Sequence, residues 1–199
     1  NGNQGVIGWY VAPWMVKKYP DITNWKNLNK YANLFKTAES GGKGAFLDGD
    51  PSYVTNDEAL IKNLKLNFKV VYTGSEAALI TAFRNSEKQK KPVIGYFYEP
   101  QWFLAEVPLV HIKLPAYTVG CDKDPKTIAC DYPPYRLNKI ASAKFMKSGS
   151  PAAKFIAAFK WTNADQNAVA KSIAQDKMTD DQAGKKWVDA NKAKVSAWL

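Results

Sequence analysis

The sequence of 199 residues lacks most of the signatures that identify an enzyme. Its single histidine, His111, has no serine or cysteine nucleophile motif beside it, so no catalytic triad can be assembled. The glycine-rich segment 40–46 lacks the spacing and the Lys-Ser/Thr ending of a phosphate-binding loop, and a turn is the better interpretation. We locate no pair of carboxylates for acid–base catalysis. The sequence therefore predicts no enzymatic activity and no catalytic residues.

Ligand sets for a metal ion are equally scarce. The segment 47–58, "LDGDPSYVTNDE", resembles a calcium loop only in its acidity, because the glycine and the final glutamate are misplaced. The two cysteines have no nearby histidine or second cysteine pair to complete a zinc site. We expect neither a metal nor a cofactor.

Arginine-rich stripes are also missing, although the net charge is +10. Such a charge is compatible with nucleic-acid binding, but the lysines are scattered over separate polar segments, which is typical of a solvated surface. The densest aromatic segment carries an acid, Glu99, where a nucleic-acid site would interleave basic residues. We expect no nucleic acid as a partner, and a basic nucleic-acid-binding module is the less favoured alternative.

Cysteine is limited to Cys121 and Cys130, which lie in one polar segment that contains Asp-Pro. A disulfide is favoured over metal binding, and closing a loop of this size stabilises by about 2–3 kcal/mol in the chain-entropy model. A disulfide indicates an oxidising, periplasmic or otherwise extracytoplasmic setting. We find no signal peptide or membrane-spanning helix, so either an export segment has been removed or the chain is a fragment.

Strand and helix patterns alternate along the chain, and no repeat or low-complexity tract interrupts them. This order predicts the α/β class, with a helical C-terminal third. Ser150 before Pro151, and the threonines Thr162 and Thr179, are typical helix caps. We expect strands at 5–13, 45–47, 68–74, 92–98 and 109–115, and helices at 21–35, 55–68, 75–91, 150–161, 162–177 and 179–199.

Aromatic residues, by contrast, are abundant at 13% and gather at turns. The segment 95–103, "GYFYEPQWF", places five rings where an apolar strand opens into a loop. Rings beside turn residues either fill the core or line a site. A cluster of rings with few charges suits a quaternary ammonium ion, at about 0.5–2 kcal/mol per ring. The rings of interest are Trp9, Tyr10, Tyr53, Tyr98 and Trp102.

Several segments in order resemble one family, the substrate-binding proteins of ATP-binding-cassette importers for glycine betaine, choline and related methylated amines. The resemblance runs from about Gly5 to the C-terminus. It implies a two-lobed clamp of the type II periplasmic-binding-protein class that binds a methylated amine and delivers it to a membrane permease; a trimethylamine N-oxide-binding protein of the same fold is the alternative. The segments are "GVIGWYVAPWMVKKYPDITNWKNL", "GDPSYVTND", "YTGSEAALITAF", "KKPVIGYFYEPQW", "VHIKLPAY" and "CDYPPYRLNKIASAKF".

The resemblance also implies an aromatic cage. Its first ring precedes an x-Pro-x-Trp segment, which is Tyr98 here, and its second follows a Gly/Pro turn, which is Tyr53. A third ring in some choline binders corresponds to Trp9 or Tyr10. Glu99 departs from the usual small polar residue, and we expect it to pair with the cation or with a protonated amine oxide. Trp102 is expected to pack behind the site.

By the same resemblance, residues 5–107 form a complete second lobe and residues 108–199 the later part of the other lobe. That other lobe would be incomplete, because family members carry a further segment before Gly5. The side chains of Phe155, Ile156 and Phe159 would then have too little to pack against. We therefore expect a preceding N-terminal segment, or a second chain, as a partner.

Overall fold

The computed structural model describes residues 1–53 and 55–199, which form two units. The sheet unit comprises Ile7–Tyr98 and Val107–Pro133, and the helical unit comprises Asn1–Val6, Glu99–Glu106 and Pro134–Leu199. These units differ from the expected division at residue 107, because residues 107–133 belong to the sheet unit and residues 1–6 and 99–106 to the helical unit.

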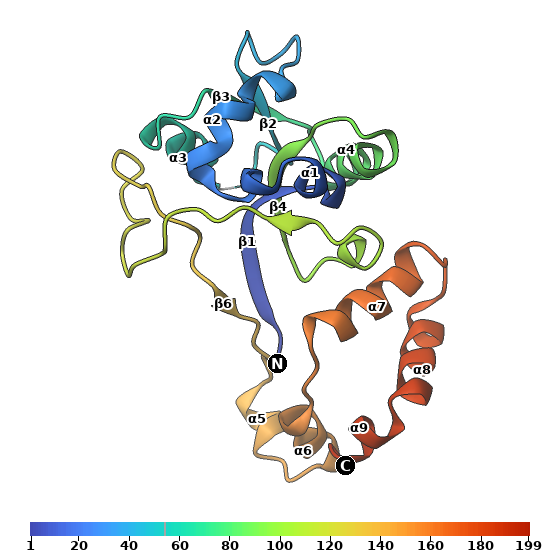
Figure 1. Cartoon of the computed structure of the whole chain (residues 1–199). Helices are drawn as coiled ribbons and strands as arrows, with labels where there is room; N and C mark the ends of the chain where they lie inside the picture. Colours follow the sequence, from blue (N-terminus) through green and yellow to red (C-terminus); the bar gives the residue numbers. More distant parts are fainter. Residues whose placement is uncertain (54) are drawn as a thin grey trace. The chain divides into compact units, whose positions relative to one another are not determined.

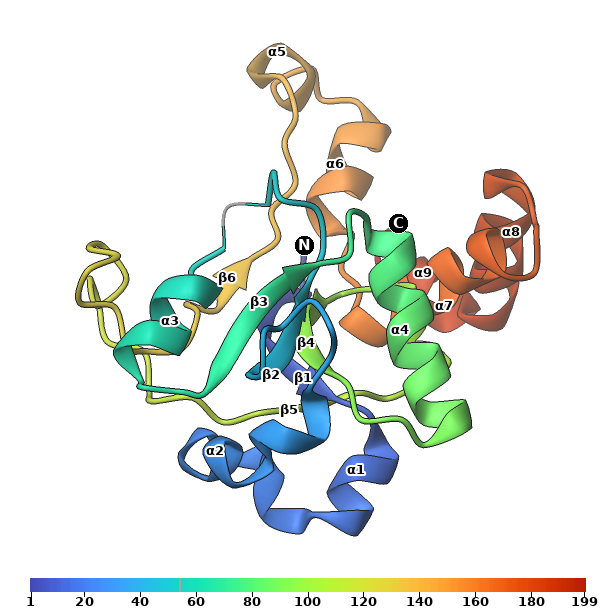
Figure 2. The same cartoon turned by 90° about the horizontal axis from the view of Figure 1, so that it is seen from above.

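The sheet unit contains a mixed sheet in the order β3-β2-β4-β1-β5; strands β1 to β4 are labelled in Figure 1 and β5 in Figure 2. The strand β2 is parallel to both β3 and β4, whereas β1 and β5 are antiparallel, with Tyr10 opposite His111. The expected strand at 109–115 is reduced to two residues. The strands are β1 (Gln4–Val11), β2 (Gly44–Asp48), β3 (Phe68–Tyr72), β4 (Ile94–Glu99) and β5 (Val110–His111).

The two faces of this sheet are covered by different helices, α3 (Asp57–Asn63) and α4 (Glu76–Gln89) (Figure 2). On the α3 face, the rings of Trp9 and Phe46 lie 4.6 Å apart. On the α4 face, Phe97 contacts Phe83 at 5.6 Å and Tyr10 at 6.2 Å between ring centroids. Alternation along each strand therefore divides the aromatic residues between two packed layers.

The expected helix at 21–35 is broken into short turns. Pro20–Thr23 (η1), Trp25–Asn27 (η2) and Ala32–Phe35 (η3) are 3-10 turns, and only α2 (Leu28–Tyr31) is α-helical. The apolar residues still point inward, with Leu28 and Phe35 buried. The segment 21–35 is therefore stabilised by burial of its apolar side chains and not by one continuous series of helical hydrogen bonds. A helix that we did not expect, α1 (Pro13–Lys18), precedes it.

His111 has a packing role in this sheet. Its ring lies 5.0 Å from that of Tyr10 and directly over Gly8, where an added Cβ would approach Nε2 to 2.0 Å. Only glycine leaves room for the imidazole at position 8.

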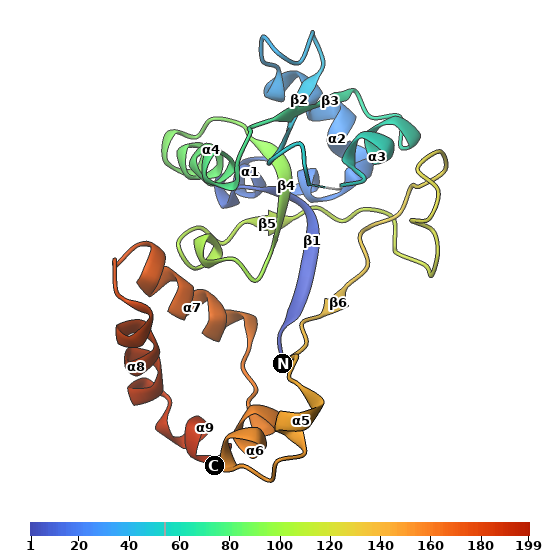
Figure 3. The same ribbon diagram turned by 180° about the vertical axis from the view of Figure 1, so that it is seen from behind.

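The helical unit contains the pair β1–β6, joined at Gln4–Arg136 and Gly5–Tyr135, and adjacent helices α7 and α8 (Figure 3). The expected caps are confirmed: Ser150 accepts from the N–H of Ala152, and Thr162 and Thr179 form capping boxes. The elements are η4 (Trp102–Ala105), β6 (Tyr135–Arg136), α5 (Ala143–Met146), α6 (Pro151–Ala158), α7 (Asn163–Ala174), α8 (Asp180–Ala190) and α9 (Lys192–Ser196).

Aromatic packing also holds this unit. Phe155 and Phe159 lie 6.0 and 4.8 Å from the buried ring of Trp198 and are half-buried, so each has an aromatic partner within the unit. Ile156 remains 37% exposed. None of the helices in the described part of the chain is long and apolar enough to cross a bilayer.

Candidate ligand site

Two of the aromatic residues beside turns, Tyr53 and Tyr98, lie at the carboxyl edge of the parallel strands. Asp48 ends β2 and Glu99 ends β4, and the N–H of Thr73, just beyond β3, donates to the carbonyl of Asp48 at 2.8 Å. Tyr53 lies in the loop that leaves β2. In open α/β sheets this edge is where ligands bind, because the loops that leave the strands converge there.

Three tyrosine rings form a continuous cluster at this edge. Tyr96 and Tyr98 are two residues apart near the carboxyl end of β4. Tyr96 lies 6.1 Å from Tyr53 and 6.1 Å from Tyr98, between ring centroids. Tyr96 is 8% exposed, while the other two are half-buried. Tyr96 is thus the floor of the cluster, and Tyr53 and Tyr98 flank it.

The expected difference between Tyr98 and its neighbour Phe97 is seen in their burial, although the two rings stack on one another at 5.7 Å and the Tyr98 hydroxyl reaches Glu76 of α4. Phe97 is fully buried against α4, whereas Tyr98 is half-buried. Tyr96 was not among the residues predicted from the sequence. The period of two along "YFY" was the available signal, since it places Tyr96 beside Tyr98 rather than beside Phe97.

Glu76, the first residue of α4, makes the cluster electronegative. The Tyr98 hydroxyl donates a hydrogen bond to Glu76 Oε1. Burial and this hydrogen bond raise the pKa of Tyr98, so the phenol stays protonated. Burial raises the pKa of Tyr53 as well, followed by the negative charges of Glu76, Asp50 and Asp48. Three carboxylates near one ring favour a cation over an anion. No local pattern pointed to Glu76, because the contact spans 22 positions.

Buried carboxyl groups support the loop that carries Tyr53. Asp48 accepts from the N–H of Gly49 at 2.7 Å and from the hydroxyl of Thr55 at 2.9 Å. Asp57 is fully buried and accepts from Trp9 Nε1 at 2.6 Å. Burial, with the charge of Asp48 as a smaller cause, raises the pKa of Asp57 to about 7.

The remaining oxygen of Asp57 explains how two acids share this interior. Among the described residues no hydrogen-bond donor reaches Asp57 Oδ2. A proton on Asp57 that points to the Asp48 carboxylate satisfies this oxygen and removes one of the two charges. Asp57 is therefore the protonated partner at acidic pH.

Trp9 and Tyr10 lie in the core of the sheet unit. Each is 1% exposed; Trp9 donates to Asp57, and Tyr10 packs between Phe97 and His111. The structure does not bring either ring to the surface of the tyrosine cluster. Core packing accounts for their aromatic character.

Glu99 and Trp102 belong to the helical unit. Glu99 Oε2 accepts from Asn163 Nδ2 at 3.0 Å, and the same amide nitrogen donates to the carbonyl of Gln4 at 2.9 Å. The ring of Trp102 meets that of the fully buried Phe103 edge to face at 6.1 Å. Glu99 thus already has a neutral partner, and Trp102 packs on a core residue of its own unit.

Two hollows elsewhere are poorly suited to a methylated cation. A groove of about 430 Å³ beside α3 and β3 is rimmed by Lys43, Lys62, Lys65 and Lys69, which would repel it. A groove of about 320 Å³ between α7 and α8 offers a single ring, Trp187. The ammonium group of Lys194 already lies 5.6 Å from the centroid of that ring. The tyrosine cluster is the better candidate.

Comparisons with known proteins agree with this architecture. The family model described as the substrate-binding domain of ABC-type glycine betaine transport systems matches residues 1–190. The chain is 29% identical over 195 residues to the trimethylamine N-oxide-binding protein of Pelagibacter ubique (strain HTCC1062), covering 96% of this chain and 62% of that protein. The chain therefore spans about 62% of the length of that curated relative.

Solved structures show the same fold at low identity. Lactococcal OpuAC in its closed, glycine betaine-bound form superposes with a TM-score of 0.59 at 21% identity, covering 99% of this chain and 68% of that one. A glycine betaine/carnitine/choline ABC transporter structure gives a TM-score of 0.63 at 15% identity, covering 100% and 62%.

The family match places this chain in the class of substrate-binding domains of ABC transport systems, and the solved structures share its fold. More particularly, this chain belongs to the family of substrate-binding domains of ABC-type glycine betaine transport systems. The resemblance and the α/β fold class inferred from the sequence are confirmed.

Proposed function

We propose that this protein binds a small methylated amine, such as glycine betaine, choline or trimethylamine N-oxide, on the rings of Tyr53, Tyr96 and Tyr98. The observation that carries the proposal is the cluster of three tyrosines next to Glu76 at the carboxyl edge of the sheet. A trimethylammonium group has no N–H to donate, so π faces and diffuse negative charge are what can recognise it.

The three rings can supply only part of the binding free energy. Three rings at about 0.5–2 kcal/mol each supply a few kcal/mol, whereas micromolar binding requires about 8 kcal/mol. Hydrogen bonds to the oxygen atoms of the ligand, or its desolvation, must contribute the remainder. The half-exposed Tyr53 can offer its hydroxyl to such an oxygen. Glycine betaine, choline and trimethylamine N-oxide each carry one.

Delivery to a membrane permease and a periplasmic or extracytoplasmic location are part of the proposal. Family membership and the disulfide support both. In this proposal the sheet unit is the lobe that supplies the tyrosines, and the helical unit is part of the other lobe.

A further polypeptide, either a preceding segment or a second chain, belongs to the same proposal. Exposed apolar side chains in the helical unit support it, because a partner that covered them would remove apolar area from water. Intact mass and light scattering test this, and a monodisperse 22.2 kDa monomer with full affinity would contradict it. The exposed residues are Ile140, Met146, Ile156, Val188 and Leu199.

Calorimetric titration of the whole chain tests ligand binding. The panel contains glycine betaine, choline, trimethylamine N-oxide, an oligonucleotide, and 3,3-dimethylbutanol, the uncharged carbon isostere of choline. We expect at least one methylated amine to bind, and choline to bind more tightly than its isostere, because only the cation gains from the π faces. Binding of the oligonucleotide alone, or of no amine at millimolar concentration, would overturn the proposal.

A further inference from the structure

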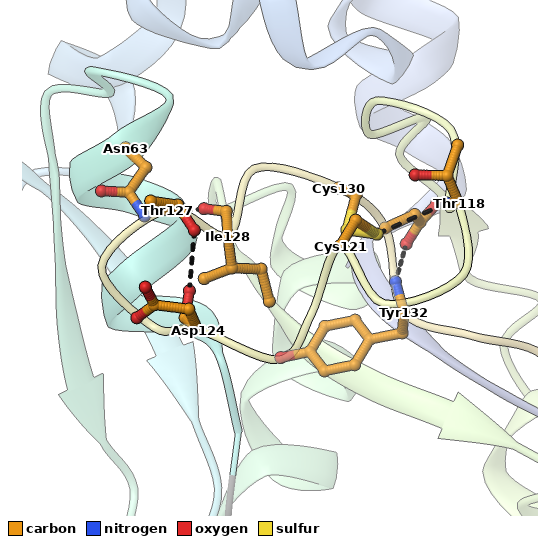
Figure 4. The surroundings of a disulfide bond; sticks show 9 residues. Asn63, Thr118, Cys121, Asp124, Thr127, Ile128, Cys130 and Tyr132 are labelled. Carbon is orange, nitrogen blue, oxygen red and sulfur yellow. Dashed lines mark hydrogen bonds between the residues drawn. A yellow bond between two sulfur atoms is a disulfide. The ribbon is translucent and has the colours of Figure 1, made fainter.

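The disulfide closes a loop that is fastened to the end of α3 (Figure 4). The predicted Cys121–Cys130 bond is present, with a Cα–Cα distance of 6.3 Å. Ile128, inside the loop, is 1% exposed. Its carbonyl accepts from Asn63 Nδ2, on the last residue of α3, at 2.7 Å, and the carbonyl of Pro125 accepts from the same nitrogen at 3.3 Å.

Tyr132, two residues after the disulfide, reaches the opposite end of the same helix. Its hydroxyl donates to Asp57 Oδ1 at 2.7 Å and accepts from the backbone N–H of Asn56 at 3.0 Å. Just before it, the N–H of Asp131 donates to the carbonyl of Pro115 at 2.7 Å, which anchors the chain that follows the disulfide. The segment 121–132 is therefore hydrogen-bonded to both ends of α3.

The contact with Asn56 bears on the ligand site because Tyr53 lies only three residues earlier. The N–H of Thr55 donates to the carbonyl of Tyr53 at 3.0 Å, and the Thr55 hydroxyl donates to Asp48 at 2.9 Å. Tyr53 in turn packs on Tyr96. A displacement of Asn56 would thus be transmitted to Tyr53 through Thr55.

We propose that Tyr132, held by the disulfide-closed loop, is a positioning residue that fixes the Tyr53 side of the ligand site through its hydrogen bonds to Asn56 and Asp57. This inference rests on the proposed function for its effect on binding, but its structural part can be measured without a ligand. Tyr132 itself touches Asn56 and Asp57, not the tyrosine cluster, so it acts through them.

Removing only the hydroxyl should leave the fold in place. In Tyr132→Phe, Asp57 keeps its bond from Trp9, and α3 keeps its buried residues Leu60 and Ile61. The N–H of Asn56 loses its acceptor. The expected consequence is local: the N-terminus of α3 and the adjoining loop open more often, while the rest of the sheet unit is unchanged.

The test combines ligand-free hydrogen exchange with titration. Tyr132→Phe is compared with the wild type and with Tyr135→Phe, a 41% exposed tyrosine of the helical unit. Exchange at the Asn56 amide should be faster only in Tyr132→Phe, and affinity for the tightest methylated amine of the panel should fall by about fivefold. Thermal unfolding of both variants should stay near that of the wild type.

Each outcome decides the proposal. Unchanged exchange at Asn56, or unchanged affinity, would overturn it. If the wild type binds no methylated amine, the proposed function fails. Hydrogen exchange at the Asn56 amide still tests whether Tyr132 positions this segment. If Tyr132→Phe does not fold, the wild type is compared before and after reduction of the disulfide; the same local acceleration is expected, and equal exchange would overturn the inference.

Discussion

The hydroxyl of Tyr98 is hydrogen-bonded to the carboxylate of Glu76 across 22 positions of the sequence. The bond ties the end of a central strand to the first turn of the helix α4. It orients the Tyr98 ring and places a negative charge beside the cluster. A cage for a methylated cation needs both features, a fixed π face and a negative potential.

The ring of Tyr98 can be tested separately from its hydroxyl. We expect Tyr98→Ala to weaken binding of a methylated amine by about 1–2 kcal/mol, because one π face is lost. Tyr98→Phe keeps the face and should lose less. Calorimetry measures both affinities, and equal losses in the two variants would assign the effect to the hydroxyl instead.

For the neighbouring residue Phe97 we expect a loss of stability. Phe97 is fully buried between Tyr10 and Phe83, so Phe97→Ala should lower the free energy of unfolding by roughly 3–5 kcal/mol. Urea unfolding checks this against Tyr98→Ala, which should change stability far less. If Phe97→Ala keeps its stability while Tyr98→Ala unfolds, then Tyr98 and not Phe97 is the ring that packs in the core.

The charge of Glu76 should matter most for ligands with a net positive charge. In Glu76→Gln the amide oxygen can still accept from Tyr98, but the negative charge is gone. We expect binding of choline to weaken by roughly 1 kcal/mol and binding of the zwitterion glycine betaine to change less. Titrations at low and high salt check the electrostatic origin, and equal losses for both ligands would argue against it.

Asp57 should make stability depend on pH. Its folded pKa, about 7, lies above its ordinary value of 3.8, so the folded state holds a proton that the unfolded state releases. The stability contributed by this group is complete below pH 3.8 and is lost as pH rises to about 7. Between pH 5 and pH 8 the wild type should lose roughly 2–3 kcal/mol through Asp57 alone.

Asp57→Asn supplies the matched control for that pH dependence. The amide imitates the protonated acid, since its oxygen can accept from Trp9 and Tyr132 and its nitrogen can donate to Asp48. Urea midpoints at pH 5 and pH 8 should differ less in the variant than in the wild type. If both proteins respond equally, Asp48 and Asp131, whose pKa values are also raised by burial, carry the effect.

The disulfide should contribute to stability through its loop. Replacing both cysteines with serine should lower the free energy of unfolding by about 2–3 kcal/mol, because the unfolded chain regains the freedom of a loop nine residues long. Chemical unfolding without reductant measures the loss. Since the wild type under reductant should match the double variant, a large difference between them would indicate that the serines disturb the fold.

Several local features of this protein could be predicted from its sequence alone. Strand alternation predicted that Phe97 is buried in the core and that Tyr98 is more exposed, and their burial follows this prediction. Ser150, Thr162 and Thr179 start helices because their oxygens accept the first free N–H groups. Two cysteines in one polar loop indicated their own disulfide. The ordered segments with Tyr53 and Tyr98 also indicated the family.

Tertiary structure alone decided which rings surround a ligand. Trp9 and Tyr10 have the same local pattern as Tyr98, but neighbours far away in the sequence cover them, and burial is a property of the packed sheet rather than of the strand. Glu76, Asp57 and Tyr132 met their partners only when strands and loops converged at one edge. The segment 21–35 shows the same limit, since its helical periodicity was satisfied by short turns once its apolar face was buried.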